Sequence, residues 1–362
     1  YAVNFFEYKC NYADINIFIE LVSNILMKYA PVNILIPNQE WYYRSWIPYV
    51  NSFDMILVKT KYAQKIFRKI KNEPDTVKYI GWGSKDRYDN KYKKDYNKYF
   101  HLCGKSIHKQ TQRLINTWEL DMPDLTICYN PKFVTLEHKN QENINYITER
   151  LNEEELIKLM NVCGIHICCS DTEGFGHYIH EAKSCKAVVI STSAPPMCSY
   201  FRDGEDGFLV SYSKKVKIKE HLGSKYIFDI SDMKKMIKKT IKNTQMLNPQ
   251  SLSQIGERAR KSFFKTCQDF DYHFGTEFGK VMSLALKKSN EFKKNKELEI
   301  NRMKEMSKDH NLPSISIITP TYNRRHMFKL AIQNWNNINY PSDKIEWIIV
   351  DDGEDKVYDM IP

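Results

Sequence analysis

Two glutamates eight positions apart, Glu173 and Glu181, are the side chains of this sequence best spaced to act together. Between them lies Gly174-Phe175-Gly176, which follows an apolar stretch typical of a buried strand and precedes a predicted helix. Glycines at a strand-to-helix turn let the backbone approach a ligand, and the helix N-terminus offers unpaired N–H groups to a phosphate. Carboxylates beside such a turn can hold hydroxyl groups, so the spacing favours a nucleotide sugar. Two solvated acids on a capped helix are the alternative.

The ten residues EGFGHYIHEA, 173–182, resemble the Glu-x7-Glu motif of retaining glycosyltransferase family 4, also called glycosyl transferases group 1. That family has the GT-B fold, in which two Rossmann-like domains face each other. The resemblance implies that Glu173 and the three backbone amides after it contact the donor sugar. It also implies that Glu181 holds the nucleotide ribose.

Two lysines precede a predicted helix in the region where this family binds the donor diphosphate. A strand-like segment ends at Gly104, and Lys105 and Lys109 follow it before the helix expected over 110–118. The family has a Gly-Arg pair and then a lysine here, so the resemblance implies that both lysines pair with the diphosphate and act with Glu173 in catalysis. Lysine keeps the charge of arginine but lacks its bidentate fork. A solvated helix start is the alternative.

The surrounding elements follow the order of the same family. A helix is predicted over 153–161 with Asn152 as its N-cap, and residues 203–210 match the family's "dG-x-x-G-x-l-v" hairpin. One departure is Pro195-Pro196, where the family commonly has two glycines. Proline has no N–H to offer a phosphate, so the usual backbone contact is not expected there.

The N-terminal part, residues 1–98, alternates strand and helix patterns, which is typical of a parallel sheet. It resembles the latter part of a family 4 N-terminal domain. Asn38, Gln39 and Glu40 follow the predicted strand 32–36, at the edge where such sheets bind ligands, and are candidates for the sugar or acceptor side. The histidine that the family often has here is missing, and ordinary turn residues are the alternative.

The C-terminal part has a second strand–helix–strand pattern. The segments SIITPTYNR and EWIIVDDG resemble the start of a family 2 glycosyltransferase of the GT-A fold. This resemblance implies that Thr321, Tyr322, Asn323 and Asp351 contact a nucleotide. The family's metal-binding residues lie further downstream, so a divalent metal is expected only for a complete GT-A module.

The predicted fold class is therefore α/β. It comprises a GT-B arrangement of two facing Rossmann-like domains, the N-terminal one incomplete, and the first βαβ unit of a GT-A domain. The expected division is a partial acceptor-side domain over 1–98, a donor-binding domain with a crossing-back helix over 99–287, a charged linker over 288–312, and a truncated GT-A domain over 313–362.

Composition is that of a soluble globular protein of 362 residues, with 42% hydrophobic and 27% charged residues. No apolar run reaches the roughly 18 residues of a membrane span, although peripheral membrane association is compatible with the sequence. The first residues do not resemble a signal peptide and suggest a fragment cut at its N-terminus. The nine cysteines lack zinc-site spacing and fit reduced thiols in the cytoplasm.

The net charge of +10, from 54 basic and 44 acidic residues, is concentrated in the stretch 214–242. Such an excess could attract nucleic acid, an anionic membrane or a diphosphate donor. Lysines at helical spacing are more typical of a solvated helix face, and nucleic acid is not expected as a partner.

Together these features predict a hexosyltransferase that moves a sugar from a nucleotide-diphosphate donor to an alcohol of a glycan, lipid or protein. By resemblance, the transfer retains anomeric configuration and the GT-B module needs no metal or other cofactor. The chain is expected to be part of a larger, two-module glycosyltransferase. A non-catalytic GT-B scaffold that binds a partner or polyanion, and a GT-B epimerase or phosphorylase, are the alternatives.

Overall fold

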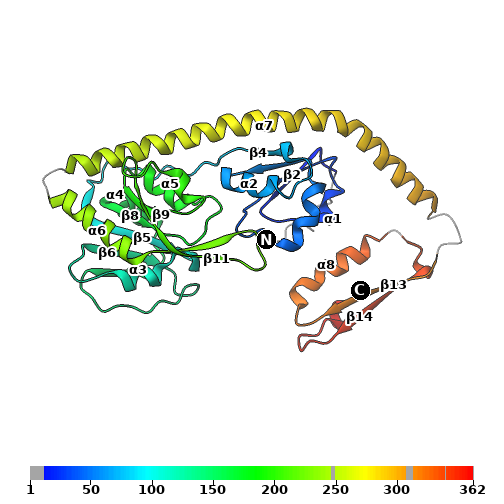
Figure 1. Cartoon of the computed structure of the whole chain (residues 1–362). Coiled ribbons are helices and arrows are strands. Elements are labelled where there is room, and N and C mark those ends of the chain that lie inside the picture. The colour runs from blue at the N-terminus through cyan, green and yellow to red at the C-terminus, as the bar shows by residue number, and fades with distance from the viewer. Residues whose placement is uncertain (1–11, 246–248, 307–312, 339, 362) are drawn as a thin grey trace. The chain divides into compact units, whose positions relative to one another are not determined.

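The computed structural model describes residues 12–245, 249–306, 313–338 and 340–361 (Figure 1). They form two compact units. The first comprises Ile15–Met27 and Val32–Leu284, and the second comprises Lys28–Pro31 and the described parts of Tyr1–Asp14 and Ala285–Pro362. The four-stranded and the six-stranded parallel sheets lie in the first unit. Each unit is described by itself.

A four-stranded parallel sheet, in the order β1-β2-β3-β4, opens the first unit. Every residue of β2 and β3 is buried, because helices and loops pack on this sheet around Tyr42, Phe53 and Phe67. The helix expected after β1 is short, since Glu20 adopts a left-handed conformation with φ of 66°. The elements are β1 (Ile15–Ile19), α1 (Asn24–Met27), β2 (Val32–Ile36), η2 (Arg44–Ser52), β3 (Met55–Val58), α2 (Lys61–Arg68), η3 (Pro74–Thr76) and β4 (Val77–Tyr79).

A six-stranded parallel sheet follows, in the order β10-β9-β8-β5-β6-β7. The chain lays β5, β6 and β7 in one direction and then returns to lay β8, β9 and β10 on the other side of β5. The order therefore reverses between β5 and β8, and such a switch point is where open α/β sheets bind ligands. The strands are β5 (Asp95–Gly104), β6 (Asp124–Tyr129), β7 (Ile144–Ile147), β8 (Cys163–Cys168), β9 (Val188–Thr192) and β10 (Phe208–Val210).

The connections between these strands are helical. The predicted N-cap of the fourth helix is confirmed, because Asn152 Oδ1 accepts a hydrogen bond from the amide of Glu155 at 2.9 Å. The Glu155 carboxylate accepts in turn from the amide of Asn152 at 2.8 Å, which completes a capping box. The helices are η4 (Ile107–Lys109), α3 (Thr111–Thr117), α4 (Glu153–Val162), α5 (His177–Ser184), η5 (Met197–Tyr200) and α6 (Ile230–Gln245).

The lysine-rich stretch divides between a hairpin and a helix. Residues up to Phe228 form an antiparallel hairpin of β11 (Tyr212–Lys217) and β12 (Ser224–Phe228), and only its later lysines lie on α6. Every residue of β11 is exposed. After Gly223, the aromatic and β-branched residues Tyr226, Ile227 and Phe228 favour a strand. The lysines of β11 are solvated there as they would be on a helix.

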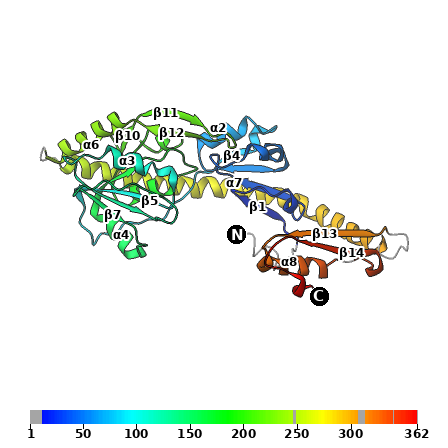
Figure 2. The ribbon, with the colours of Figure 1, turned by 90° about the horizontal axis from the view of Figure 1, so that it is seen from below.

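The helix α7 (Pro249–Met306) continues through much of the segment expected to be a linker (Figures 1 and 2). Residues 307–312 of that segment lie outside the described part. Its lysines, glutamates and leucines are strong helix formers, and Lys296 pairs with Glu299 one turn on, at 2.6 Å. A charged stretch without apolar periodicity can therefore still be helical. Within the first unit, Phe270 of α7 lies against Trp82, which follows β4, and Glu257 of α7 pairs with Lys186, which precedes β9.

In the second unit, β13 (Ile315–Thr321) and β14 (Ile345–Asp351) form a two-stranded parallel sheet joined by α8 (Arg325–Asn336) and η6 (Ser342–Lys344). The register places Thr321 beside Asp351. The short helix η7 (Tyr358–Met360) follows. The structure confirms the predicted strand–helix–strand pattern, but it does not show a GT-A fold.

The cysteines in the described part of the chain are free, and most of them are buried. No described helix is both long and apolar enough to cross a membrane. The described residues also contain no group of three or more His, Cys, Asp or Glu side chains arranged to hold a metal ion.

Candidate functional site

Two loops meet at the switch point of the six-stranded sheet, one after β5 and one after β8. The amide of Asp171 donates to the carbonyl of His108 at 2.8 Å, and the two side chains approach to 3.0 Å. Next to this connection, the ammonium of Lys109 binds the carboxylate of Glu173. The structure thus brings these two predicted residues into direct contact although they are 64 positions apart.

The surroundings of this pair hold both charges in place. Ser170 Oγ donates to Glu173 Oε1 at 2.6 Å, and the Lys109 ammonium lies 3.3 Å from the centroid of the Tyr178 ring. The side chains of Lys109 and Glu173 are 12% and 14% exposed. Little water screens such a pair, so the lysine charge can act strongly on a ligand anion.

The two glycines of the turn have separate roles. Gly176 has φ of 88° and is the N-cap of α5, so the left-handed conformation favours glycine there. A Cβ on Gly174 would lie 2.6 Å from both Asn38 Oδ1 and Glu40 Oε1. Only glycine at this position lets the segment after β2 pack against the turn. The ring of Phe175 lies away from these contacts, stacked on a buried histidine of α5 at 4.3 Å.

All three polar residues predicted after β2 reach this turn. Gln39 Nε2 donates to the carbonyl of Glu173 at 2.7 Å, and Asn38 and Glu40 lie against the next residue, Gly174. Lys59 follows β3, was not identified from sequence, and donates to Asn38 Oδ1 at 2.9 Å. The only feature of the sequence that could have identified Lys59 is its position as a charged residue directly after a buried strand.

Glu40 has a buried carboxyl group, and a backbone hydrogen bond and the charge of Lys59 only partly offset the effect of burial on its pKa. The residue is 4% exposed, and its Oε2 has no hydrogen-bond partner among the described residues. Burial raises the pKa of Glu40 to about 8, and the nearby charge of Glu173 also raises it. Glu40 is therefore protonated at neutral pH and can donate a hydrogen bond to a hydroxyl.

Glu181 lies in α5 and contacts an arginine that sequence reasoning missed. Arg87 Nη2 is 3.5 Å from Glu181 Oε1, and Arg87 Nη1 donates to Glu153 at 2.8 Å. Burial raises the pKa of Glu181, while Arg87 opposes that rise. Arg87 lies in the irregular segment between the two sheets, where no local pattern predicts a functional side chain.

The structure separates Lys105 from the pair of Lys109 and Glu173. Lys105 is exposed, and its ammonium lies 4.7 Å from the centroid of the Phe133 ring. Gly104 before it has φ of 61° and open space around its Cα. Both line a cavity of about 350 Å³ at the carboxyl ends of β5, β6 and β7. The other lining residues are Leu102, Cys128, Tyr129, Asn130, Thr148, Glu149, Arg150, Leu151 and Leu156.

The β11–β12 hairpin bonds to the segment that carries the polar residues after β2. The amide of Leu222 donates to the carbonyl of Tyr42 at 3.0 Å. The amide of Arg44 donates to the carbonyl of Glu220 at 2.8 Å. This pairing fixes residues 38–44 against the turn. The hairpin was missed because its strands are short and its lysines suggested a helix.

The residues predicted to bind a nucleotide in the second unit gather at the carboxyl ends of β13 and β14. Thr321 is buried, whereas Tyr322 is 64% exposed. The side-chain oxygens of Asn323 and Asp351 accept hydrogen bonds from backbone amides of the loop 353–357. In this structure the side chains of Asn323 and Asp351 therefore cap a loop of their own unit.

Comparison with known proteins agrees with this geometry. Residues 129–245 match the family model described as Glycosyl transferases group 1, and this match includes Glu173 and Glu181. This part of the chain is therefore similar to glycosyl transferases group 1. The sequence has no match among curated proteins.

Solved structures show the same fold at low identity. They include Anabaena Alr3699/HepE in complex with UDP, with 14% identity and a TM-score of 0.53 over 78% of this chain and 80% of that chain. The pneumococcal O-GlcNAc transferase GtfA in complex with UDP and GlcNAc has 12% identity and a TM-score of 0.55, over 78% of this chain and 59% of that chain. Sucrose-phosphate synthase from Thermosynechococcus elongatus has 11% identity and a TM-score of 0.53 over 70% and 68%. The first unit thus has an α/β fold with parallel sheets like that of GT-B glycosyltransferases.

Proposed function

We propose that this protein transfers a sugar from a nucleotide-diphosphate donor to an alcohol acceptor. The observation that carries the proposal is the contact of Lys109 with Glu173 at the switch point. Glu173 lies within residues 129–245, which match the glycosyl transferases group 1 model. The structures of Anabaena Alr3699/HepE and pneumococcal GtfA contain UDP, which supports a nucleotide donor by analogy of fold.

In this proposal the donor lies across the carboxyl ends of β5 and β8. The cavity of about 350 Å³ at β5, β6 and β7 is of a size to take the nucleoside, with Lys105 at its edge. Lys109 and the amides of residues 174–176 stabilise the departing diphosphate. Glu181 binds the ribose hydroxyls. When the donor is bound, these hydroxyls replace Arg87 as the partner of Glu181.

The sugar lies beside Glu173 and the segment after β2. Gln39 and the protonated Glu40 offer hydrogen-bond donors to sugar hydroxyls, and Asn38 completes this wall. These side chains take the place of the histidine that family 4 often has there. We further propose that the sugar is a hexose, that its configuration is retained, and that this module uses no metal, because Lys109 supplies positive charge to the leaving group.

The test is calorimetric titration with UDP and GDP, followed by assays of nucleotide release from a panel of nucleotide sugars. Lys109→Ala is expected to lower turnover about 100-fold or more, and Glu181→Ala should mainly weaken nucleotide binding. Lys132→Ala is a matched control, because Lys132 is an exposed lysine of the same domain. Normal turnover in both Lys109→Ala and Glu181→Ala would contradict the proposed donor site. Failure of the wild-type protein to bind either nucleotide supports a non-catalytic scaffold instead.

For the second unit we propose the start of a family 2 module of the GT-A fold. The support is the register that sets Thr321 beside Asp351 at the carboxyl ends of two parallel strands. In such a module, a nucleotide would replace the backbone amides of the loop as the hydrogen-bond partner of Asp351 and Asn323.

A further inference from the structure

A second cavity of the first unit, about 430 Å³, lies beside the turn that follows Glu173. Phe175 lines it from this turn, Thr60 lines it from the end of β3, and Asp269 lines it from α7. Four basic side chains also line it, namely Lys59, Lys61, Arg202 and Lys265. None of the roles proposed above uses this cavity.

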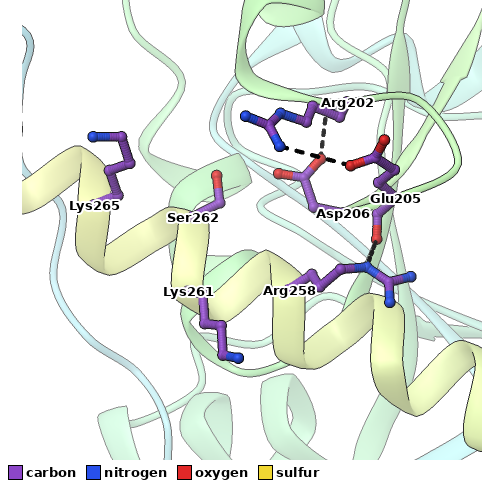
Figure 3. A pocket seen from close by; sticks show the side chains of 7 residues that line it. All are labelled: Arg202, Glu205, Asp206, Arg258, Lys261, Ser262 and Lys265. Carbon is purple, nitrogen blue, oxygen red and sulfur yellow. Dashed lines mark hydrogen bonds and ion pairs between the residues drawn. The ribbon is translucent and has the colours of Figure 1, made fainter.

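A smaller hollow of about 290 Å³ continues from it and shares Arg202 and Lys265. Figure 3 shows this hollow between α7, which carries Arg258, Lys261 and Lys265, and the loop that carries Arg202. We call the two hollows together the basic groove. Six basic side chains line it, which are the four of the larger cavity together with Arg258 and Lys261.

The carboxylates of the basic groove already have partners. Asp206 binds the ammonium of Lys183 at 3.2 Å and accepts from the backbone amide of Arg202 at 2.7 Å. The other two acids, Glu205 and Asp269, each pair with a lysine or arginine of the groove itself. By contrast, no carboxylate of the described residues lies within ion-pair distance of Lys61, Arg258 or Lys261. The basic groove thus has an excess of positive charge.

One end of the basic groove reaches the proposed sugar site. Lys59 lines the groove and also donates to Asn38 Oδ1 at 2.9 Å, and Asn38 lies against Gly174. Tyr200 lines the same end, and its buried hydroxyl has no hydrogen-bond partner among the described residues. A ligand in the groove could therefore present a hydroxyl to the sugar while an anionic group lies among the basic side chains.

We propose that the basic groove binds a phosphate group of the acceptor substrate. This inference rests on the proposed function, because it gives that reaction a chemical class of acceptor, an alcohol that carries a phosphate. Arg202 offers a planar fork that matches phosphate oxygens, and Lys61 and Lys265 add charge from the two sides of the cavity. A lipid phosphate and a soluble phosphate ester present the same group, so the experiment separates them.

The test measures binding to the whole chain with the donor site saturated by UDP. One arm compares glycerol 3-phosphate with glycerol by calorimetry, and the other compares vesicles of phosphatidylcholine with and without phosphatidylglycerol. The variant removes two exposed charges, Arg202→Ala with Lys265→Ala. The matched control, Lys235→Ala with Lys238→Ala, removes the same charge from exposed positions of α6.

We expect the wild-type protein to prefer the phosphate-bearing probe in one arm, and the groove variant to lose about tenfold in affinity. The control should stay within about twofold. Normal UDP binding together with equal phosphate affinity in the groove variant and the control would overturn the groove alone. Absence of UDP binding to the wild-type chain would overturn the proposed function and the acceptor role together.

Discussion

The two units contain the same local pattern, a strand followed by a polar turn and a helix, but they bury it differently. All six residues of β8 are buried, because the strand lies inside a six-stranded sheet. In β13 the last residue, Thr321, is the only buried one of the strand, since that sheet has two strands. Parallel strands are normally covered on both faces, and only the first unit meets this condition.

The acids at the ends of these strands differ in the same way. Glu173 is bound by Lys109, and its carbonyl accepts from Gln39, which is 134 positions away. Asp351 instead accepts from the amides of Gly353 and Val357, two and six positions away. Equivalent strand-end acids can thus serve a site assembled from distant segments or cap their own loop. Packing around the strand decides which.

Neutralising each of the two acids in turn should have very different effects on activity. Glu173→Gln should lower release of nucleotide from the preferred donor by about 100-fold or more, because it removes a charge that holds Lys109 and the sugar. Asp351→Asn should change that rate by less than about twofold. Steady-state kinetics on both variants, with melting curves to show that each folds, provides the measurement. Equal losses would contradict the separation of roles.

The buried carboxyl of Glu40 gives the first unit a pH signature. Its folded pKa of about 8 lies above the ordinary value of 4.5, so the folded state binds more protons between these values. Stability should therefore fall as the pH rises from about 5 to about 8, by an amount on the order of a few kcal/mol. Glu40→Gln should remove this fall and be more stable than the wild type at pH 8.

Urea unfolding at pH 5 and pH 8.5 measures this effect. Glu142→Gln is the control, because Glu142 is an exposed acid of the same unit and should leave the pH dependence unchanged. A wild-type protein with equal stability at both pH values, or a Glu40→Gln variant that still loses stability, would show that Glu40 is ionised in the folded state.

The smallest expected effect concerns the close approach at Gly174. Gly174→Ala places a Cβ 2.6 Å from the side chains of Asn38 and Glu40, and should destabilise the first unit by about 1–3 kcal/mol. Gly279→Ala, in the middle of α7 with open space around it, should be neutral or stabilising by up to about 1 kcal/mol. Thermal melting of both variants checks this difference. If Gly174→Ala does not lower the melting temperature, the segment after β2 is not packed closely against the turn.

Much of the local structure could be predicted because its causes are close in sequence. The apolar run 32–36 predicted β2, and Asn152 as an N-cap predicted the start of α4. Glycines between a strand and a helix predicted the turn at Gly174. Charge alone did not predict the β11–β12 hairpin in the lysine-rich stretch, and it did not predict how far α7 extends.

The sequence by itself determined β2, the start of α4, the glycine turn after Glu173, and the acidic and basic side chains at the strand ends. Only the tertiary structure decided that Lys109 rather than Lys105 meets Glu173, that Arg87 binds Glu181, and that a hairpin holds Gln39 at the turn. These contacts join segments that no local pattern relates. The physical reason is the reversal of strand order between β5 and β8, which brings two distant loops to one edge and lets burial strengthen the charges placed there.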